Sequence, residues 1–379
     1  MLCLLSLIFA VGCNSSKSDS DIIEKGFQEE KAGNWTAAAA DFTEVIERDP
    51  ENGPAYALRA TAERRLKEYD LAISDYNRAI EINARDDFAY LGRGMTKYEK
   101  SEYDDAVSDY FHAIQLNRTN AVTYAELGLA DYYLTNYADA IINFTRAIEL
   151  GGNSSVVYAD RGLARSRSGD IDGAIADYSK AIELDPEYNK AYVNRGLAKS
   201  KKGDPDGAIA DYNRAIEINP KDSIAYEDRS LVMERKRDFG AAMSDANKAI
   251  ELNPTNAAAY NDRGWIEFRK GEFDSSIADA THAVQLNPTN GYAYGTRGWA
   301  RYGKGDISGA VEDCKTAVKD DQPDSYGYSF DQGMLDFIAG DYEKAIADWQ
   351  KAIQQNASIK SELQPWIDKA QAKLQEKKP

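Results

Sequence analysis

Small and apolar residues recur along this chain with a period of 34 residues. One copy of the pattern consists of Tyr192, Arg195, Gly196, Gly203, Ala208, Tyr212, Ala215 and Pro220. The copy before it has Tyr158, Gly162 and Tyr178 at the matching places, and ten copies can be followed. A fixed period of this length predicts a solenoid, because each repeated unit buries its apolar face only against its neighbours.

Each copy predicts two helices joined by a short turn. The turn carries Gly-Asp, as at Gly169–Asp170, and the Asp is suited to cap the second helix by accepting backbone N–H bonds. A proline such as Pro186 then ends that helix. The copies begin at Asp19, Gly53, Asp87, Ala121, Ser155, Asn189, Ser223, Ala257, Gly291 and Tyr326, and only the last step departs from 34 residues.

The repeats divide the chain into four predicted segments. Residues 1–12 are read as a signal peptide, 13–21 as a lipidated cysteine with a flexible tether, and 22–357 as one elongated all-α domain of ten repeats. Residues 358–379 are predicted to form a capping helix, because apolar residues recur there at helical spacing. Those residues are Leu363, Trp366, Ile367, Ala370 and Leu374.

The pattern from Asp19 to Ala357 resembles the tetratricopeptide repeat (TPR), whose consensus is aromatic, Leu, Gly, Tyr, Gly, Tyr, Ala, Phe, Ala, Pro. The chain departs from it at Ile22, which replaces the first aromatic, and at Ala357, which replaces the last proline. The resemblance implies a right-handed superhelical solenoid of helix pairs. It also implies that the first helix of each pair lines a concave groove that takes a peptide or a partner helix.

Seven copies share an arginine followed sixteen residues later by an aspartate. The pairs are Arg59 and Asp75, Arg93 and Asp109, Arg161 and Asp177, Arg195 and Asp211, Arg229 and Asp245, Arg263 and Asp279, and Arg297 and Asp313. The fourth copy has Leu127 and Asn143 instead, so both charges are lost together. This exchange favours a structural ion pair between the two helices of a unit. The alternative is an arginine ladder for anionic ligands.

The aromatic residue of the second helix is lost toward the end of the chain. Ala246, Ala280 and Cys314 stand where earlier copies have Phe or Tyr, and the next copies carry Trp265, Trp299 and Met334 in place of Leu. Two interpretations stay open. The larger side chains either refill the vacated volume or form an aromatic wall in the groove.

The resemblance maps a partner-binding groove onto particular residues. Its aromatic members are Tyr98, Tyr132, Trp265, Phe268, Tyr292, Trp299 and Tyr302. Its cationic members are Arg65, Arg167, Lys201, Arg235 and Arg269. These cations are suited to an acidic peptide or a C-terminal carboxylate. The alternative is that they only complement helix dipoles, each by about 0.3–1 kcal/mol.

The net charge of −17 limits the classes of molecule that the chain is expected to bind. Nucleic acids and anionic bilayers both prefer a basic surface, so we expect a protein or peptide partner and no nucleic acid. Membrane attachment would then depend on a lipid anchor. The oligomeric state cannot be read from these features.

The N-terminus resembles a bacterial lipoprotein signal. The apolar run Leu2–Val11 leads through Gly12 to Cys13, the predicted lipidation site. Ala10 stands where the lipoprotein motif usually has Leu, and no Lys or Arg precedes the run. A plain cleaved signal or a short anchor is the alternative. Cys314 would then be the one cysteine left unmodified, which excludes an intramolecular disulfide in the mature chain.

No residue pattern indicates catalysis, a metal or a cofactor. The two histidines, His112 and His282, lie five repeats apart, and no Cys/His cluster has zinc spacing. We therefore expect a non-enzymatic scaffold, tethered in the cell envelope of a Gram-negative-type bacterium. A soluble exported or cytosolic adaptor is the first alternative, and an enzyme with a dispersed site is the second.

Overall fold

The computed structural model describes residues 17–320 and 325–376. Within these ranges the protein is all-α. The predicted signal peptide and Cys13 lie outside the described residues. None of the described helices is long and apolar enough to cross a membrane.

The chain divides into two compact units, which meet in sequence at Pro186 and Glu187 and are described separately here. Unit 1 contains α2 (Lys17–Ala32), α3 (Trp35–Arg48), α4 (Gly53–Arg65), α5 (Tyr69–Ile82), α6 (Asp87–Glu99), α7 (Tyr103–Leu116), α8 (Ala121–Tyr133), α9 (Tyr137–Glu149), α10 (Ser155–Ser168) and α11 (Ile171–Leu184). The prediction of one continuous domain over residues 22–357 stays a prediction.

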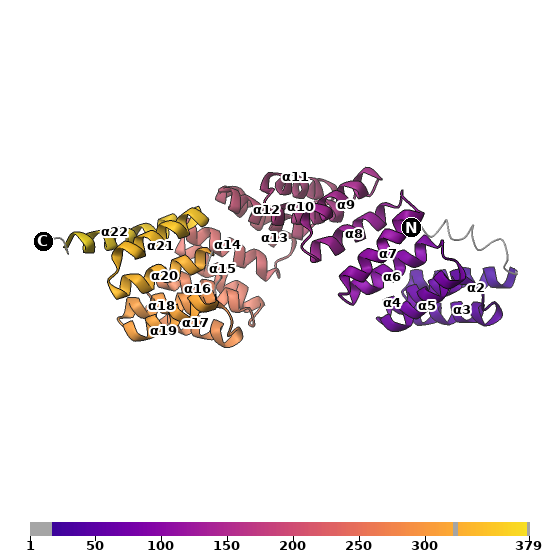
Figure 1. Cartoon of the computed structure of the whole chain (residues 1–379), viewed down its shortest axis with the longest axis horizontal. Coiled ribbons are helices and arrows are strands. Elements are labelled where there is room, and N and C mark those ends of the chain that lie inside the picture. The colour runs from indigo at the N-terminus through magenta and orange to yellow at the C-terminus, as the bar shows by residue number, and fades with distance from the viewer. Residues whose placement is uncertain (1–16, 321–324, 377–379) are drawn as a thin grey trace. The chain divides into compact units, whose positions relative to one another are not determined.

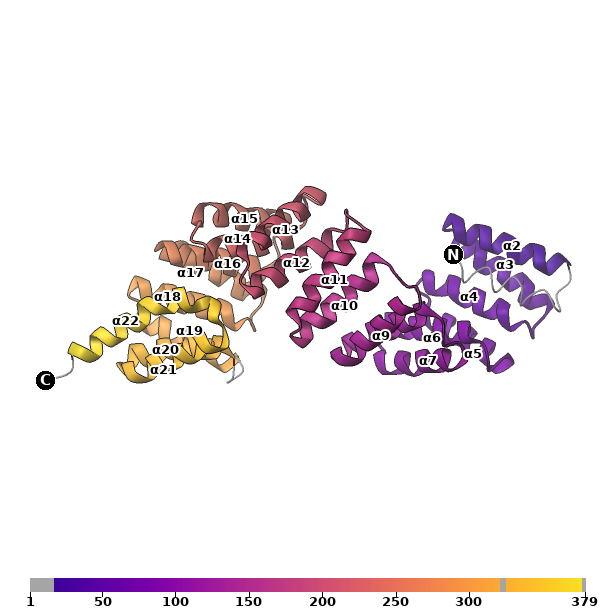
Figure 2. The same cartoon turned by 90° about the horizontal axis from the view of Figure 1, so that it is seen from above.

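Unit 2 continues the same alternation of first and second helices and adds a last helix. It contains α12 (Asn189–Lys202), α13 (Pro205–Ile218), α14 (Ser223–Arg235), α15 (Phe239–Leu252), α16 (Ala257–Lys270), α17 (Phe273–Leu286), α18 (Gly291–Lys304), α19 (Ile307–Asp320), α20 (Tyr326–Ala339), α21 (Tyr342–Gln355), the short 3₁₀ turn η1 (Ala357–Ile359) and α22 (Lys360–Glu376). Figures 1 and 2 show the stacked helix pairs of each unit, and Figure 1 draws α22 in yellow beside α21.

The repeat period places the helices accurately. From Gly53 onward, every predicted repeat start is the first residue of a helix. The Asp170 side chain accepts a hydrogen bond from the Gly173 amide, which confirms its predicted role as N-cap of α11. Gly169 ends α10 with φ of 91°, a conformation that glycine adopts without strain. The second helix α11 ends at Leu184, two residues before Pro186.

Glycines on the first helices let aromatic rings of the second helices approach closely. A Cβ atom at Gly162 would lie 2.8 Å from the Tyr178 ring, and one at Gly196 would lie 2.8 Å from the Tyr212 ring. Both rings are fully buried. These helix pairs are therefore held by a large side chain set against a residue with no side chain.

Candidate partner-binding site

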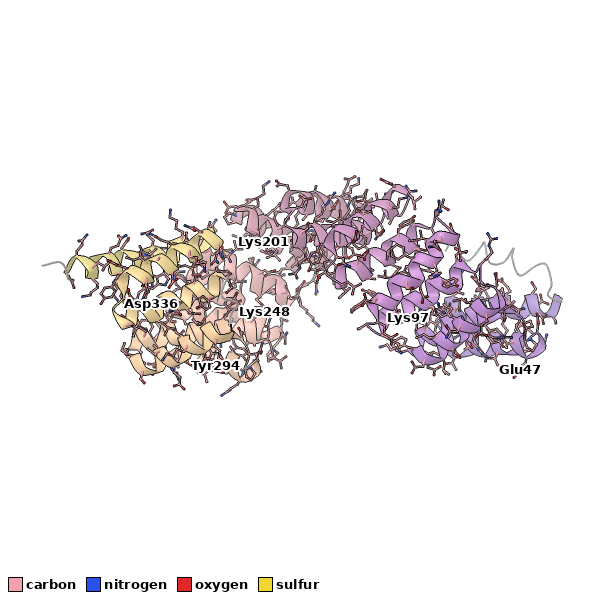
Figure 3. All side chains as sticks on the ribbon, in the orientation of Figure 1. Glu47, Lys97, Lys201, Lys248, Tyr294 and Asp336 are labelled. Atoms are coloured by element: carbon pink, nitrogen blue, oxygen red, sulfur yellow. The ribbon has the colours of Figure 1, made fainter. Side chains whose placement is uncertain are left out.

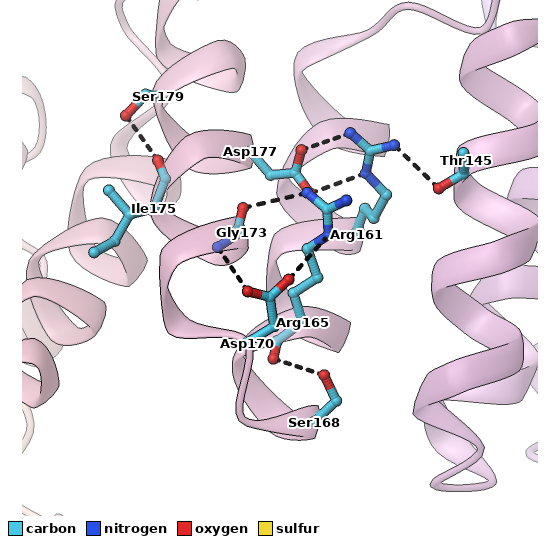
Figure 4. Close-up of polar contacts among 9 residues, drawn as sticks. All are labelled: Thr145, Arg161, Arg165, Ser168, Asp170, Gly173, Ile175, Asp177 and Ser179. Atoms are coloured by element: carbon cyan, nitrogen blue, oxygen red, sulfur yellow. Dashed lines mark hydrogen bonds and ion pairs between the residues drawn. The ribbon is translucent and has the colours of Figure 1, made fainter.

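The predicted Arg–Asp pairs form a frame inside the units. In α10, the Arg161 Nε and Nη2 atoms donate to the Asp177 carboxylate of α11 at 2.9 and 2.6 Å. The remaining Nη1 donates to Thr145 Oγ1 of the preceding pair at 3.1 Å, and the guanidinium carbon lies 5.4 Å from the Tyr158 ring centroid. Figure 4 shows the hydrogen bonds of Arg161 with Asp177 and Thr145. One arginine thus joins two successive pairs.

The same arrangement recurs at the other six positions. Bidentate hydrogen bonds join Arg59 to Asp75, Arg93 to Asp109, Arg195 to Asp211, Arg229 to Asp245, Arg263 to Asp279 and Arg297 to Asp313. In the fourth pair, the Asn143 amide instead donates to Asp131 at 2.7 Å. The structural-pair interpretation therefore accounts for this series, because the guanidinium donors face aspartates within the frame.

Six rings gather on the first helices of unit 2, and we call them the unit 2 aromatic cluster. They are Trp265 and Phe268 of α16, Trp299 and Tyr302 of α18, and Phe330 and Phe337 of α20. Trp299 lies at the centre, with ring centroids of Phe330 at 4.7 Å, Phe268 at 6.1 Å and Trp265 at 6.4 Å. Its Nε1 donates to Asp331 at 2.8 Å.

The prediction that Trp299 lines an open groove is wrong, because only 1% of the surface of this residue is exposed. Trp366 of α22 packs edge-on against it, with ring centroids 5.1 Å apart. Trp299 is therefore a core residue beneath α22 rather than a groove residue open to a partner. Trp265, Phe268 and Tyr302 keep partial exposure.

The structure also separates the two interpretations of the tryptophans. Next to Ala242 and Ala246, the buried residue is Ile266 rather than Trp265. Trp265 points into the unit 2 aromatic cluster instead, with its centroid 5.1 Å from Phe268 and 5.7 Å from Phe330. The aromatic-wall interpretation fits Trp265 better, although α22 covers part of that wall.

Two pockets flank the start of α22. The larger, of about 810 Å³, is lined by rings of the unit 2 aromatic cluster and by the cations Arg237, Arg269, Lys270 and Lys369. The smaller, of about 310 Å³, includes Trp265 and Phe330 and the carboxylates of Glu234, Asp262, Asp331 and Glu362. Cations outnumber carboxylates in the larger pocket, whereas carboxylates outnumber cations in the smaller one.

Two carboxylates share one guanidinium between these pockets. Arg269 Nη1 lies 2.7 Å from Glu234 of α14 and 3.7 Å from Glu362 of α22. Burial, together with the neighbouring Glu234, raises the pKa of Glu362 to about 7. Burial likewise raises the pKa of Asp262 to about 8. The smaller pocket therefore holds carboxyl groups that titrate near neutral pH.

Unit 1 has its own group of rings on α6 to α9, which we call the tyrosine cluster. It consists of Tyr98, Tyr103, Tyr132, Tyr133 and Tyr137. Tyr133 stacks on Tyr103 with centroids 5.1 Å apart and contacts Tyr98 at 5.7 Å and Tyr132 at 5.6 Å. Tyr132 raises the pKa of the Arg167 guanidinium through a side-chain hydrogen bond. Of the predicted groove residues, Tyr98, Tyr132 and Arg167 are thus brought together here.

The other predicted groove residues are less closely grouped. Tyr292 and Arg235 line the smaller pocket, and Arg235 Nη1 donates to Ser200 Oγ at 3.3 Å. Lys201, labelled in Figure 3, is exposed and lines neither pocket. Arg65 lies over the Trp35 ring at 5.7 Å from its centroid.

Sequence reasoning missed several residues of these surfaces. Phe330, Glu234 and Glu362 were not singled out, although all three line a pocket. It also missed that the second residue of several first helices is an exposed apolar side chain, namely Val122 and Val156 in unit 1 and Ile224, in addition to Tyr292, in unit 2. Their recurrence at one place in the repeat was the available signal.

The described residues offer little for covalent or metal chemistry. Cys314 is buried, and burial raises the pKa of its thiol. Among residues 17–320 and 325–376, no group of three or more His, Cys, Asp or Glu side chains is placed to hold a metal ion.

Comparisons with solved structures find helical repeat proteins. A TPR repeat-containing protein from Cytophaga hutchinsonii is 22% identical, with a TM-score of 0.50, over 63% of this chain and 98% of that one. The pilF protein of Pseudomonas aeruginosa is 19% identical, with a TM-score of 0.52, over 57% of this chain and 98% of that one. These similarities establish the fold alone. A comparison with curated proteins finds no match.

Family comparisons match segments throughout the chain. The tetratricopeptide repeat is matched at residues 29–88, 190–222, 246–278 and 296–358, and the TPR repeat at 162–203. Together the segments cover more than half of the chain, and each spans helices described above. The chain is therefore a member of the tetratricopeptide repeat family.

Proposed function

We propose that this protein is a non-enzymatic scaffold that binds a partner protein or peptide on the face formed by its first helices. The observation that carries this proposal is a set of exposed apolar side chains at the second residue of first helices, at Val122 and Val156 in unit 1 and at Ile224 and Tyr292 in unit 2. Exposed apolar side chains that recur at one place in the repeat favour a protein interface over a solvated surface.

The pockets beside α22 support the same conclusion. They combine large rings with charged side chains of both signs, a composition typical of surfaces that bind protein segments. The net charge of −17 opposes binding to nucleic acid. A protein or peptide is the partner class that fits both observations.

Site-specific photocrosslinking in the native host tests this proposal. A photoreactive phenylalanine analogue replaces Tyr133 of α8, which is 53% exposed, or Tyr292 of α18, which is 48% exposed. The matched control is Phe111 on the second helix α7, which is 51% exposed. We expect a discrete partner adduct from at least one first-helix position and none from Phe111. Equal labelling from all three positions would refute a binding face on the first helices.

We further propose that the chain is a lipoprotein of the bacterial cell envelope, anchored through Cys13. The lipoprotein-like start of the sequence motivates this proposal. Mass spectrometry of the mature N-terminus should find an acylated Cys13, and Cys13→Ser should move the protein from the membrane to the soluble fraction. An unmodified Cys13 in the native host would leave the alternative, a soluble exported or cytosolic adaptor.

A further inference from the structure

Helix α22 contacts first helices of three successive pairs. Its Trp366 ring lies 5.1 Å from Trp299 and 5.7 Å from Tyr302 of α18, and 5.9 Å from Phe337 of α20. Its Glu362 carboxylate lies 3.7 Å from Arg269 of α16. A helix that only closed the end of the repeat stack would need to cover α20 and α21. Helix α22 extends further, across the unit 2 aromatic cluster.

Two stripes of side chains on α22 make these contacts. Leu363, Ile367 and Ala370 are buried in the apolar core with Met334, Phe337 and Trp349, as the predicted cap requires. The neighbouring stripe consists of Glu362, Trp366 and Lys369, spaced by four and three residues. Lys369 Nζ lies 5.6 Å from the Tyr302 centroid and 5.5 Å from the Phe337 centroid. This second stripe supplies an anion, an indole and a cation to the first-helix face.

We propose that the face formed by α14, α16, α18 and α20 is a receptor for an amphipathic helix, and that α22 occupies it as an internal ligand. This inference rests on the proposed function and specifies its partner. The partner is a helix with the pattern Glu-x-x-x-Trp-x-x-Lys or a close equivalent, and it binds by replacing the second stripe of α22.

Helix α22 does not fill the space beside it on this face, so a partner helix could replace its second stripe. Pockets of about 810 and 310 Å³ remain beside the first turns of α22. Arg269 must also neutralise both Glu234 and Glu362. A partner helix that fills the pockets therefore gains contacts that α22 does not make.

The test uses the full chain and a fluorescein-labelled synthetic peptide of residues 357–376. In one variant, Leu363→Asp and Trp366→Ser together remove contacts from both stripes of α22. A second variant, Glu362→Lys, alters only the contact with Arg269 and keeps the apolar stripe. The control is Asp368→Asn, because Asp368 is exposed and accepts a hydrogen bond from Gln364, one turn earlier on the same helix.

Fluorescence anisotropy then measures peptide binding in trans. We expect the double variant to bind the peptide at least ten-fold more tightly than the wild-type or Asp368→Asn chains do. The peptide affinity of the Glu362→Lys chain should lie between that of the double variant and that of wild type. Adding Arg269→Glu to the double variant should abolish the gain. If the double variant has lost its helical circular dichroism signal, the outcome is decided by comparing the peptide affinities of the Glu362→Lys and wild-type chains.

Equal peptide affinity of the Glu362→Lys and wild-type chains, or no detectable peptide binding by any chain, would overturn this inference. That failure can be distinguished from failure of the proposed function. A photocrosslink from Tyr133 or Tyr292 in the absence of peptide binding would leave the scaffold function standing and remove α22 as its internal ligand.

Discussion

The tyrosine cluster of unit 1 and the aromatic cluster of unit 2 occupy equivalent places in the repeat but have different surroundings. Tyr98 and Tyr132 are the twelfth residues of their first helices, as are Phe268 and Tyr302. In unit 1 the neighbouring Tyr133 remains 53% exposed. In unit 2 the central Trp299 is buried, because α22 covers it. The rings at the shared twelfth position are partly exposed in both units, so the two clusters differ in the rings around that position.

This difference shows which features are common to the repeats of both units and which occur in unit 2 alone. The Arg–Asp frame and the glycine-to-ring packing are present in both units. Two additions distinguish unit 2, namely tryptophans at the ninth residue of α16 and α18 and the stripe of α22 that meets them. The proposed docking face of unit 2 therefore differs from unit 1 by departures from the repeat, whereas the Arg–Asp frame is common to both units.

The largest expected effect is that of Trp299→Ala. Removing a fully buried indole should lower the free energy of unfolding of unit 2 by about 3–5 kcal/mol, because it leaves a cavity under α22 and removes the hydrogen bond from the indole to Asp331. Urea unfolding followed by circular dichroism measures this loss. A decrease of less than about 1 kcal/mol in the free energy of unfolding would show that Trp299 is not a core residue.

The next effect is a pH dependence of α22 docking. The pKa of Glu362 is raised from 4.5 to about 7 by burial and by Glu234, and this outweighs the opposite influence of Arg269 and Arg235. Because the docked carboxyl holds its proton more tightly than the free one, docking is penalised progressively as pH rises from about 4.5 to about 7. The full shift corresponds to about 3 kcal/mol.

Amide hydrogen exchange of residues 363–370, corrected for intrinsic rates, measures this dependence. We expect greater protection at about pH 5.5 than at about pH 8, and a flatter profile in Glu362→Gln. A tyrosine-cluster segment such as α8 serves as the internal reference, because its exchange should not follow the state of Glu362. Equal profiles for wild type and Glu362→Gln would contradict the assignment.

A smaller effect tests whether the frame is structural. Arg161→Leu should lower the free energy of unfolding by about 2 kcal/mol, because the buried Asp177 loses this arginine and keeps its contact with Arg165. Adding Asp177→Asn recreates the Leu127 and Asn143 combination of the fourth pair and should reduce the cost to under about 1 kcal/mol. Thermal unfolding measures both variants. A double variant as unstable as the single one would contradict the pairing.

The smallest effect is that of Tyr133→Ser in unit 1. Because Tyr133 is half exposed, stability should change by less than about 1 kcal/mol, while the partner crosslink from nearby α8 positions should weaken. Urea unfolding and crosslinking yield are the two measurements. A loss of stability comparable to that of Trp299→Ala would remove the contrast between the two clusters.

The repeat made most of the fold predictable from sequence. Positions such as Gly162 and Tyr178 recur because every pair solves the same packing problem, so copies within one chain inform each other. The joint loss of charge at Leu127 and Asn143 likewise predicted the ion pairs of the other units. Lipidation of Cys13, the cellular location, the handedness of the superhelix, a single continuous domain over residues 22–357 and the groove partner stay predictions.

The candidate site was less predictable, because its decisive contact lies outside the repeat. Trp366 was recognised as part of an amphipathic helix, but its contact with Trp299 joins residues that no periodicity relates. Glu362 gave no signal, since a glutamate in a helical first turn is ordinary at the sequence level. A terminal helix has no second copy in the chain against which its contacts could be checked.

One measurement tests most directly whether the first-helix face of unit 2 holds α22. Arg269→Glu reverses a charge on α16, whose pair is the third before α22. Lys201→Glu reverses the charge at the equivalent position of α12, and Lys201 lines neither pocket. Amide hydrogen exchange of residues 363–370 is then compared in the two full-length variants. The account predicts at least ten-fold faster exchange in Arg269→Glu and wild-type exchange in Lys201→Glu. Unchanged exchange in Arg269→Glu would mean that α22 is held only as a cap on α20 and α21, and would contradict the account.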